Sequence, residues 1–398
     1  MKYKSALEVL PAELTDKIQD YIQGEYIYIP RREKKYNSKV TAYQRELQKR
    51  DANIYLKVLE GTTKKELAEK YNLSQSSIRR IVLAQRKGYV VMQEKIKLLL
   101  QKWGIEEVSV SQVYDSAWQI GEDYILKVYE NKEDLERNIR MLRLLGEKGV
   151  PVAEVVSTAE SEKYILKDGV AYVLTKRLPG NNIIEFDKTF SQVRELGRTL
   201  GKLHNALAEI GETEGFWENS LLEELKGWIR DVFEKSDWAE ISKEEFEGVV
   251  CALEKNYDKL PMQLIHRDVH FGNFLFYQGE FSGYIDFDLS QKNIRIFDIC
   301  YFLLGLLCEE EKRKISFEEW LEISKQVFVG YSEHITLCRE ELQAVPYVME
   351  AIELLFGAWF IQCEDDVCLR DALRLYEFVK GHENEVRNIL SVTKSLQF

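Results

Sequence analysis

The sequence is poor in several features that would assign it to particular protein classes. Only six of its 398 residues are proline, and it has no Ser/Gly-rich or repetitive stretch, so no long disordered linker is expected. The amino terminus carries charges and no apolar core segment, which argues against a secretory signal. The longest apolar run, around residues 301–308, is far shorter than the roughly 20 residues that a membrane span requires. We therefore expect no membrane partner.

Cysteines are few, and none of them belongs to a CxxC motif. The six are Cys251, Cys300, Cys308, Cys338, Cys363 and Cys368. Most have apolar neighbours, which is typical of free thiols buried in a reducing compartment. We therefore expect a cytoplasmic protein.

Charge is distributed unevenly along the chain. The net charge is −12, yet residues 1–90 contain 19 Lys and Arg against 11 Asp and Glu, whereas the remaining residues contain 36 against 56. A basic segment followed by an acidic one suggests two different partners. We expect a polyanion to bind the first. The second would suit a cationic, amine-bearing substrate, although an acidic surface also serves solubility alone.

The basic segment, residues 1–90, is predicted to be all helical. Apolar residues recur at helical spacing in residues 12–22, and an aromatic stretch at residues 24–30 and a charged run at residues 31–35 follow. A second helical pattern resumes after Val40. The charged run by itself indicates no more than a solvated surface.

Two short helices are predicted near the end of this segment, at residues 66–71 and 76–83. Asn72-Leu73-Ser74 forms the turn between them, and Ser74 is the expected N-cap of the second helix. A short helix, a turn of three or four residues and a second short helix together form the pattern of a helix-turn-helix.

The second short helix would expose polar and basic side chains to a partner. They are Gln75, Ser76, Ser77, Arg79 and Arg80. Hydrogen-bonding groups beside guanidinium groups suit base edges and phosphates, whereas an ordinary helical hairpin used only for packing is the alternative. The whole segment, including Tyr-Ile-Tyr-Ile-Pro at residues 26–30, resembles the small bacterial Mor-like helix-turn-helix regulatory proteins. That resemblance implies binding to duplex DNA.

The rest of the chain has the alternation of an α+β protein. Residues 91–180 are predicted to form a β-rich lobe with helices at residues 92–103 and 133–148. Residues 181–398 are predicted to be mainly helical, interrupted by a β patch at residues 274–288. We therefore expect a small sheet lobe and a larger helical lobe after the all-α head, three domains in total.

Chemistry-bearing side chains gather between residues 264 and 288. An apolar strand leads into a loop that reads His-Arg-Asp-Val-His-Phe-Gly-Asn, and a hairpin returns as Ile-Asp-Phe-Asp. In phosphoryl transfer the protein must position the nucleophile and neutralise phosphate oxygens with Mg²⁺, which takes oxygen ligands from one or two carboxylates. Asp268 can orient an acceptor hydroxyl, Asn273 can offer an amide oxygen to the metal, and Asp286 can bridge metal and phosphates.

These two motifs resemble the aminoglycoside phosphotransferase and choline kinase superfamily, and the resemblance extends over about residues 105–380. It implies a bilobal, protein-kinase-like fold that uses ATP or GTP with Mg²⁺. It implies these roles: Asp268 as catalytic base, Asn273 and Asp286 as metal ligands, Asp288 assisting the metals or the substrate, and His266, His270 and Asp298 supporting the loop. A zinc site at the two histidines is the alternative, and it is disfavoured because no cysteine partner is present and Asp and Asn are harder ligands.

Lys127 interrupts the apolar strand Tyr124–Tyr129. A cation in such a strand requires an anionic partner, and nucleotide phosphates would serve; a lysine on an exposed sheet edge is the alternative. The resemblance makes Lys127 the phosphate-binding lysine. It also makes the segment from Thr175 to Arg177 the hinge that offers backbone groups to the purine.

Two features depart from the family pattern. The loop at residues 114–118 contains no glycine, so the segment that would cover the phosphates is not of the Gly-rich kind. The acidic partner of Lys127 on the following helix is also ambiguous. Counting back from Gly149-Val150-Pro151 leads to Asn138, whereas the nearest acid is Glu136. We take Glu136 as the expected partner.

The sequence therefore predicts an ATP- or GTP-dependent phosphotransferase that moves the γ-phosphate onto a hydroxyl of a small molecule. A transcription regulator whose kinase-like part senses a ligand without turnover is the alternative. A protein kinase is disfavoured because Asp-Phe-Asp stands where Asp-Phe-Gly would be, and no Ala-Pro-Glu follows. The acceptor stays open, although acidic residues at 309–311 and 364–366 could attract an amine-bearing alcohol.

Overall fold

A computed structural model describes residues 50–394, apart from positions 52, 56, 59–60, 72 and 115 and the segments 183–190, 213–214 and 309–314. Several predictions lie outside the described residues. They are the helix at residues 12–22, the aromatic stretch at residues 24–30, the charged run at residues 31–35 and the acidic cluster at residues 309–311.

The predicted helix-turn-helix is present. It consists of α4 (Lys64–Lys70) and the first turns of α5 (Gln75–Leu100). Ser74 is the N-cap of α5, and its side chain accepts a hydrogen bond from the backbone N–H of Ser77 at 3.1 Å. The buried core of this part consists of Ile54, Tyr55, Leu67, Ile78, Ile81 and Val82. Of the residues predicted to contact DNA, Gln75, Ser76, Arg79 and Arg80 are exposed and Ser77 is half-buried.

Helix α5 is longer than predicted. Two separate helices were expected at residues 76–83 and 92–103, but one helix of 26 residues runs through both, followed by a single 3₁₀ turn (Gln101–Trp103). The reason is that Gly88 is the only glycine between the two patterns, and no proline is present to end the helix. The boundary expected near residue 90 therefore falls inside a helix that continues into the small lobe.

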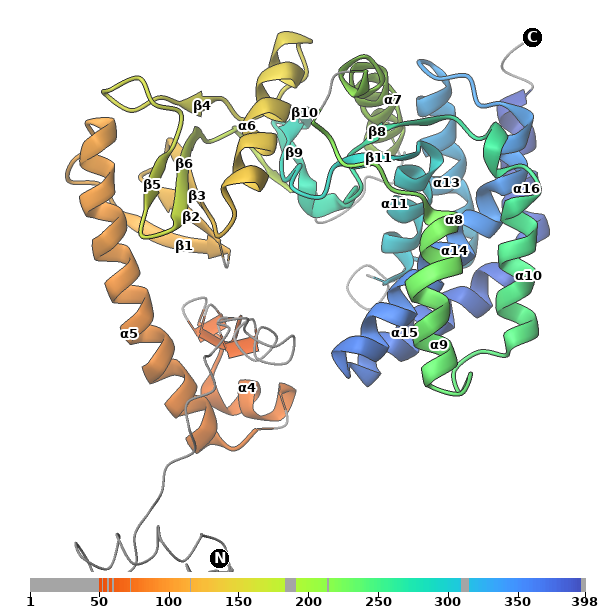
Figure 1. Cartoon of the computed structure of the whole chain (residues 1–398), viewed down its shortest axis with the longest axis horizontal. Coiled ribbons are helices and arrows are strands. Elements are labelled where there is room, and N and C mark those ends of the chain that lie inside the picture. The colour runs from red at the N-terminus through yellow and green to blue at the C-terminus, as the bar shows by residue number, and fades with distance from the viewer. Residues whose placement is uncertain are drawn as a thin grey trace, which may run out of the picture. The chain divides into compact units, whose positions relative to one another are not determined.

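The small lobe is an antiparallel sheet with strand order β1-β2-β3-β6-β4, and β5 also pairs with β6. Its elements are β1 (Val110–Tyr114), β2 (Ala117–Ile120), β3 (Tyr124–Tyr129), α6 (Lys132–Glu147), β4 (Val155–Val156), β5 (Ile165–Lys167) and β6 (Val170–Lys176). Alternate residues of β6 face opposite sides. Tyr172 and Leu174 join the core beneath α5, whereas Ala171 and Val173 pack with Leu135 of α6. Helices α5 and α6 thus cover opposite faces of the sheet (Figure 1).

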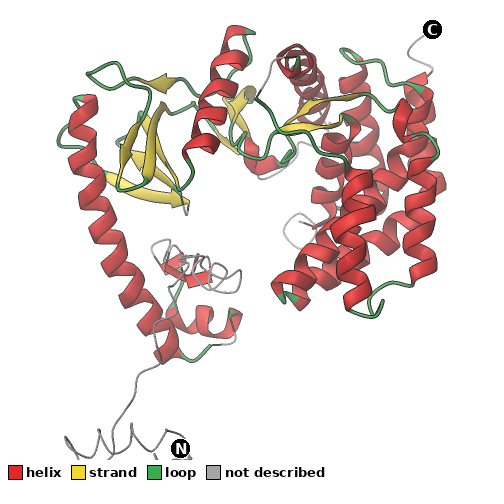
Figure 2. Cartoon of the chain, in the orientation of Figure 1, coloured by secondary structure: helices red, strands yellow, loops and turns green. Residues whose placement is uncertain are grey.

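The large lobe is mainly helical, with two small sheets (Figure 2). Its main helices are α7 (Ser191–Gly211), α8 (Leu221–Glu224), α9 (Arg230–Lys235), α10 (Lys243–Glu254), α11 (Ile296–Cys308), α13 (Phe317–Ser332), α14 (Arg339–Cys363), α15 (Asp366–Gly381) and α16 (Glu383–Lys394). One sheet contains β7 (Asn181–Asn182), β9 (Phe274–Tyr277) and β10 (Glu280–Tyr284), and the other contains β8 (Met262–Ile265) and β11 (Gln291–Ile294). The loop between β8 and β9 carries the predicted catalytic residues, so the two sheets frame it.

Two glycines allow α7 and α13 to pack closely. A Cβ added at Gly197 would lie 2.1 Å from the backbone oxygen of Val327, and one added at Gly330 would lie 2.0 Å from that of Arg194. Neither position can accept a larger residue without separating the helices, because backbone atoms cannot rotate away as a side-chain end can.

Helix α14 is the one described helix that is long and apolar enough to cross a membrane, judged by length and composition alone. In the fold, 72% of its apolar stretch is buried. Its first turn contains the fully buried Glu341, which accepts two hydrogen bonds of 2.7 Å from the guanidinium group of Arg295. Helix α14 thus serves as the central helix of the large lobe.

Candidate active site

His266 begins the catalytic loop directly after β8 and is buried. Its ring Nε2 lies 3.1 Å from the backbone oxygen of Ile285, and its ring packs on Phe287 with centroids 4.5 Å apart. Burial lowers the pKa of His266 even though the charge of Asp298 acts in the opposite direction. The neutral ring can donate its hydrogen to the carbonyl of Ile285. His266 therefore ties the loop to the segment that carries Asp286.

Asp298, in the first turn of α11, is fully buried and holds the backbone of the loop. Its Oδ2 accepts from the backbone N–H of His266 and its Oδ1 from that of Arg267, each at 2.9 Å, and His204 Nε2 lies 3.0 Å from Oδ2. Arg267 has a φ of +76°, a left-handed conformation that is costly for a residue with a Cβ. The hydrogen bonds from Asp298 hold this conformation and so fix the direction of the next residue, Asp268.

Asp268 lies among hydrogen-bond donors on both carboxylate oxygens. Asn273 Nδ2 donates to Oδ2 at 3.1 Å and to the backbone oxygen of Asp268 at 2.8 Å, and Tyr301 donates its hydroxyl to Oδ1 at 3.1 Å. His270 Nε2 lies 3.5 Å from Oδ2. Burial raises the pKa of Asp268, but the hydrogen bond and charge of His270 and the other neighbours outweigh it, so the pKa lies below its usual value. Asp268 is therefore an ionised, oriented carboxylate at neutral pH.

The ring of His270 shapes the tip of the loop. Its Nδ1 accepts a hydrogen bond from the backbone N–H of Gly272 at 3.0 Å and caps the 3₁₀ turn Phe271–Asn273. A Cβ at Gly272 would come within 2.5 Å of the imidazole, so the ring can lie here only because residue 272 is glycine.

Lys127 on β3 meets both carboxylates of the returning hairpin. Its Nζ lies 2.9 Å from Asp286 Oδ1 and 3.0 Å from Asp288 Oδ2. Burial lowers the pKa of Lys127, but the charges and hydrogen bonds of Asp288 and Asp286 outweigh it and raise the pKa. Burial likewise raises the pKa of Asp286, and the charge of Lys127 outweighs it, so this pKa is lowered. Lys127 and Asp286 are therefore both charged at neutral pH.

The structure corrects the pairing expected for Glu136. Its carboxylate accepts a hydrogen bond from the Tyr164 hydroxyl at 2.7 Å and pairs with Lys132 at 3.2 Å, on the exposed side of α6. The α6 residue that faces the site is Asn138, whose Nδ2 donates to Asp288 Oδ1. The physical reason is helical periodicity: residues two apart on a helix point in different directions, so residues 136 and 138 cannot share a face.

The predicted hinge, from Thr175 to Arg177, lies at the end of β6. Thr175 is buried, and its Oγ1 donates to the backbone oxygen of Ile125 at 3.3 Å. The backbone N–H of Arg177 donates to the backbone oxygen of Asp123 at 2.7 Å, and its side chain is exposed. The end of β6 is therefore held beside the start of β3, the strand that carries Lys127.

Oxygen ligands for a hard cation are present beside Lys127. Among the described residues no three His, Cys, Asp or Glu side chains are grouped closely enough to hold a metal ion by themselves. Mg²⁺ does not require such a group, because it is usually bound by one or two carboxylates together with phosphate oxygens and water. The backbone N–H of Ile285 donates to the backbone oxygen of Asn273 at 3.1 Å, which holds Asn273 close to Asp286. The carboxylate of Asp286 and the amide oxygen of Asn273 fit Mg²⁺ in chemistry.

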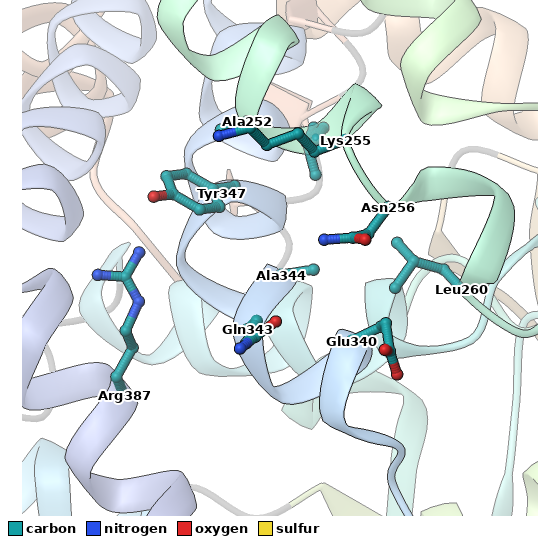
Figure 3. A pocket seen from close by; sticks show the side chains of 10 residues that line it. Ala252, Lys255, Asn256, Leu260, Glu340, Gln343, Ala344, Tyr347 and Arg387 are labelled. Atoms are coloured by element: carbon teal, nitrogen blue, oxygen red, sulfur yellow. The ribbon is translucent and has the colours of Figure 1, made fainter.

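A separate pocket of about 310 Å³ lies elsewhere in the large lobe and contains none of these residues. It is lined by Ala252, Leu253, Lys255, Asn256, Leu260, Glu340, Gln343, Ala344, Tyr347 and Arg387, from α10, α14 and α16 and the segment after α10 (Figure 3). The Arg387 guanidinium already pairs with Glu383 at 2.7 Å.

Comparison with known proteins identifies the fold and the family. A small sheet lobe with a half-buried, ion-paired lysine, joined to a helical lobe whose loop carries Asp268 and Asn273, defines a kinase-like phosphotransferase. A model of the family described as "Phosphotransferase enzyme family" matches residues 105–334, and the chain belongs to this family. It is an enzyme that transfers the γ-phosphate of a nucleoside triphosphate to a hydroxyl of a small molecule, as the sequence predicted.

Curated relatives agree with this assignment. The chain is 27% identical over 251 residues to the homoserine kinase of Phenylobacterium zucineum, covering 59% of this chain and 72% of the relative. It is 24% identical over 243 residues to the homoserine kinase of Zymomonas mobilis, covering 58% of this chain and 72% of the relative.

Solved structures confirm the predicted bilobal fold. The amicoumacin kinase hAmiN matches with a TM-score of 0.56 at 18% identity, covering 77% of this chain and 96% of that chain. The microcompartment-associated aminopropanol kinase matches with a TM-score of 0.52 at 18% identity, covering 75% and 98% respectively. At these identities the likeness concerns the fold.

The head has its own relatives. A model of the Mor transcription activator family matches residues 4–97, which agrees with the resemblance predicted from the helix-turn-helix. The uncharacterized protein YraL of Bacillus subtilis is 32% identical over 87 residues, which are 21% of this chain and 100% of that protein.

Sequence reasoning missed three residues of the site. Tyr129 donates its hydroxyl to Asp288 Oδ1 at 2.7 Å. It lies two positions after Lys127 on β3, and the period of two in a strand places both on one face, so this signal was available. Asn138 was the position reached by counting, but it was passed over because it carries no charge. Tyr301 had no signal, because its contact with Asp268 depends on the packing of α11 against a loop 33 residues away.

Proposed function

We propose that this enzyme uses Mg²⁺ with ATP or GTP to phosphorylate the hydroxyl of a small, amine-bearing alcohol in the cytoplasm, and that its head binds duplex DNA. The observation that carries the enzymatic proposal is the contact of Lys127 with Asp286 and Asp288 close to a loop in which Asn273 holds Asp268. Cys251, Cys300, Cys338 and Cys368 are free thiols, which supports a reducing compartment.

On the donor side, Lys127 is proposed to hold the nucleotide phosphates, and the backbone around Thr175 and Arg177 to hold the purine. Asp286 and Asn273 are proposed to bind Mg²⁺, which when bound neutralises charge on the phosphate oxygens. Lys127 contacts the carboxylates of both Asp286 and Asp288, so these three side chains form a compact site that contains both positive and negative groups. Such a site orients phosphates with little rearrangement.

On the acceptor side, Asp268 is proposed to accept the hydrogen bond of the substrate hydroxyl and to direct the oxygen at the γ-phosphate. Asn273 and Tyr301 fix the two carboxylate oxygens, so the carboxylate cannot rotate freely. His266, His270 and Asp298 are proposed to support this arrangement without touching the substrate.

The acceptor can be identified with a panel of alcohols. The homoserine kinase relatives make homoserine the first candidate, and choline, aminopropanol, kanamycin and glucose complete the set. With Mg²⁺ and ATP, we expect one amine-bearing alcohol to raise ADP release to a turnover on the order of 1–100 per second. Preference for glucose would contradict the amine-bearing class. Nucleotide binding without any accelerated ADP release would instead favour the ligand-sensing alternative.

The match to the Mor transcription activator family favours a second function for the head. Gln75, Ser76, Ser77, Arg79 and Arg80 are proposed to contact DNA, because they stand at the start of α5, the second helix of the helix-turn-helix. A helix N-terminus with exposed guanidinium groups suits phosphates and base edges.

DNA binding should depend strongly on salt. We expect the full-length chain to shift duplex DNA, and the double variant Arg79→Ala/Arg80→Ala to weaken binding and to flatten the slope of log K against log[salt] by about two. The matched control removes two exposed lysines of the large lobe, Lys235→Ala/Lys255→Ala, and should leave the slope unchanged. Equal effects of both double variants, or a shift that does not depend on salt, would show that the head does not bind DNA in this way.

A further inference from the structure

The carboxylates that pair with Lys127 come from an unusual part of the fold. In kinase-like sites a glutamate on the helix after the lysine strand commonly forms the ion pair that positions the lysine. Here the inward-facing residue of α6 is Asn138, which is neutral, and the expected Glu136 points elsewhere. The carboxylates near Lys127 both come from the hairpin, so the position of the lysine depends on how Asp286 and Asp288 are held.

Asp288 is held much more firmly than Asp286. Its Oδ2 accepts from Lys127 at 3.0 Å, and its Oδ1 accepts from the Tyr129 hydroxyl at 2.7 Å and from the amide of Asn138. Asp286 accepts a hydrogen bond from Lys127 through Oδ1, and its carboxyl group otherwise lies beside that of Asp288, which is not a fixed donor. Asp288 therefore has donors on both oxygens, from β3 and from α6, whereas Asp286 keeps oxygen capacity for another partner.

We propose that Asp288 is the positioning residue of Lys127, in place of a helix glutamate, and that it does not bind the metal. Tyr129 and Asn138 orient Asp288, and Asp288 orients the amine of Lys127. Metal binding is then the task of Asp286 and Asn273. This inference rests on the proposed function, because it presumes that Lys127 meets nucleotide phosphates.

The arrangement also explains why α6 carries an amide at this position. A carboxylate at position 138 would lie against Asp288 and repel it, since like charges at hydrogen-bond distance are strongly unfavourable in a partly buried site. An amide instead donates a charge-assisted hydrogen bond to the carboxylate. The negative charge that positions Lys127 thus comes from the hairpin, and α6 supplies a hydrogen-bond donor that holds Asp288.

Magnesium titration of ATP binding separates the two aspartates. With the purified full chain, we expect Asp286→Asn to raise the Mg²⁺ concentration at half-maximal ATP binding by about tenfold or more, since it removes a charged ligand. Asp288→Asn should shift it by less than about threefold. A shift in Asp288→Asn as large as that in Asp286→Asn would overturn the proposal, because it would make Asp288 a ligand of the metal.

Two variants that change no charge test the positioning role directly. Asn138→Ala and Tyr129→Phe each remove one hydrogen bond to Asp288 and touch neither Lys127 nor the metal ligands. ATP binding in EDTA should weaken by about three- to tenfold in each, the effect of one lost hydrogen bond, with the half-maximal Mg²⁺ concentration unchanged. Unaltered affinity in EDTA in both variants would also overturn the proposal.

A double-mutant cycle, measured by thermal unfolding of the metal-free, nucleotide-free protein, tests the contact even when a variant binds no nucleotide. Asp288→Asn and Asn138→Ala should lower Tm by less in combination than the sum of their separate shifts, because they remove the same contact; additive shifts would contradict the contact. If the wild-type chain bound no ATP, the proposed function would be refuted, but this cycle would still test the contact between Asp288 and Asn138. The matched control is Asp258→Asn, an exposed aspartate of the large lobe.

Discussion

The Asp268→Asn enzyme is expected to bind nucleotide as the wild type does and to lose phosphoryl transfer by about three orders of magnitude in kcat. The substitution keeps the shape of the side chain but removes the negative charge that would orient the acceptor hydroxyl. Asn273 and Tyr301 both donate hydrogen bonds to this carboxylate, so an amide at position 268 would also set one N–H against a donor.

The measurement is steady-state ADP release with the acceptor that the panel identifies, together with ATP affinity by titration. An unchanged ATP affinity with a collapsed kcat would place the effect in the transfer step. Activity within about tenfold of the wild type would show that Asp268 is not the proposed base. Parallel loss of nucleotide binding would mean that the loop had changed shape.

The Asp298→Ala variant is expected to lose about 3–5 kcal/mol of stability. Asp298 is fully buried and accepts the backbone N–H groups of His266 and Arg267, so its removal leaves two buried donors unsatisfied and frees a left-handed backbone at Arg267. The loss is a large fraction of the stability of an ordinary domain. Any folded remainder should be poorly active, because the direction of Asp268 depends on this backbone.

Chemical denaturation with circular dichroism measures this effect. Asp371→Ala is the matched control, since Asp371 is an exposed aspartate of α15 whose contact with Arg374 spans 3.9 Å, and it should change stability by no more than about 0.5 kcal/mol. A similarly small loss in Asp298→Ala would mean that the loop is held by the rest of its packing. Asp298 would then not be its support.

A single helix joins the head to the small lobe. Helix α5 begins in the helix-turn-helix and ends beneath the sheet that carries Lys127, and Tyr89 on this helix packs on Trp118 of β2 with centroids 5.1 Å apart. A ligand-sensing regulator would have the same architecture as the enzyme. The two differ in turnover, which the acceptor panel measures.

The amino-acid sequence by itself determined the parts that depend on short-range order. The loop from His266 to Asn273 lies between two short apolar strands, and the spacing of its polar residues along the chain is enough to indicate the chemistry. Helix caps behave in the same way, because Ser74 contacts a residue only three positions away. The apolar run of β3 likewise marked Lys127 as a cation that requires an anionic partner, without knowledge of which partner it is.

The tertiary structure alone decided which groups surround those residues. Lys127 meets Asp286 and Asp288 across 159 and 161 residues of sequence, and Asn138 meets Asp288 across 150. Glu136 lies near the expected helical position, but the sequence does not show that its side chain points outward. The rotation of α6 about its axis is set by the burial of Leu135 and Met141. Local patterns fix what a side chain can do, whereas the packing of helices and sheets, which depends on every buried residue at once, fixes what it touches.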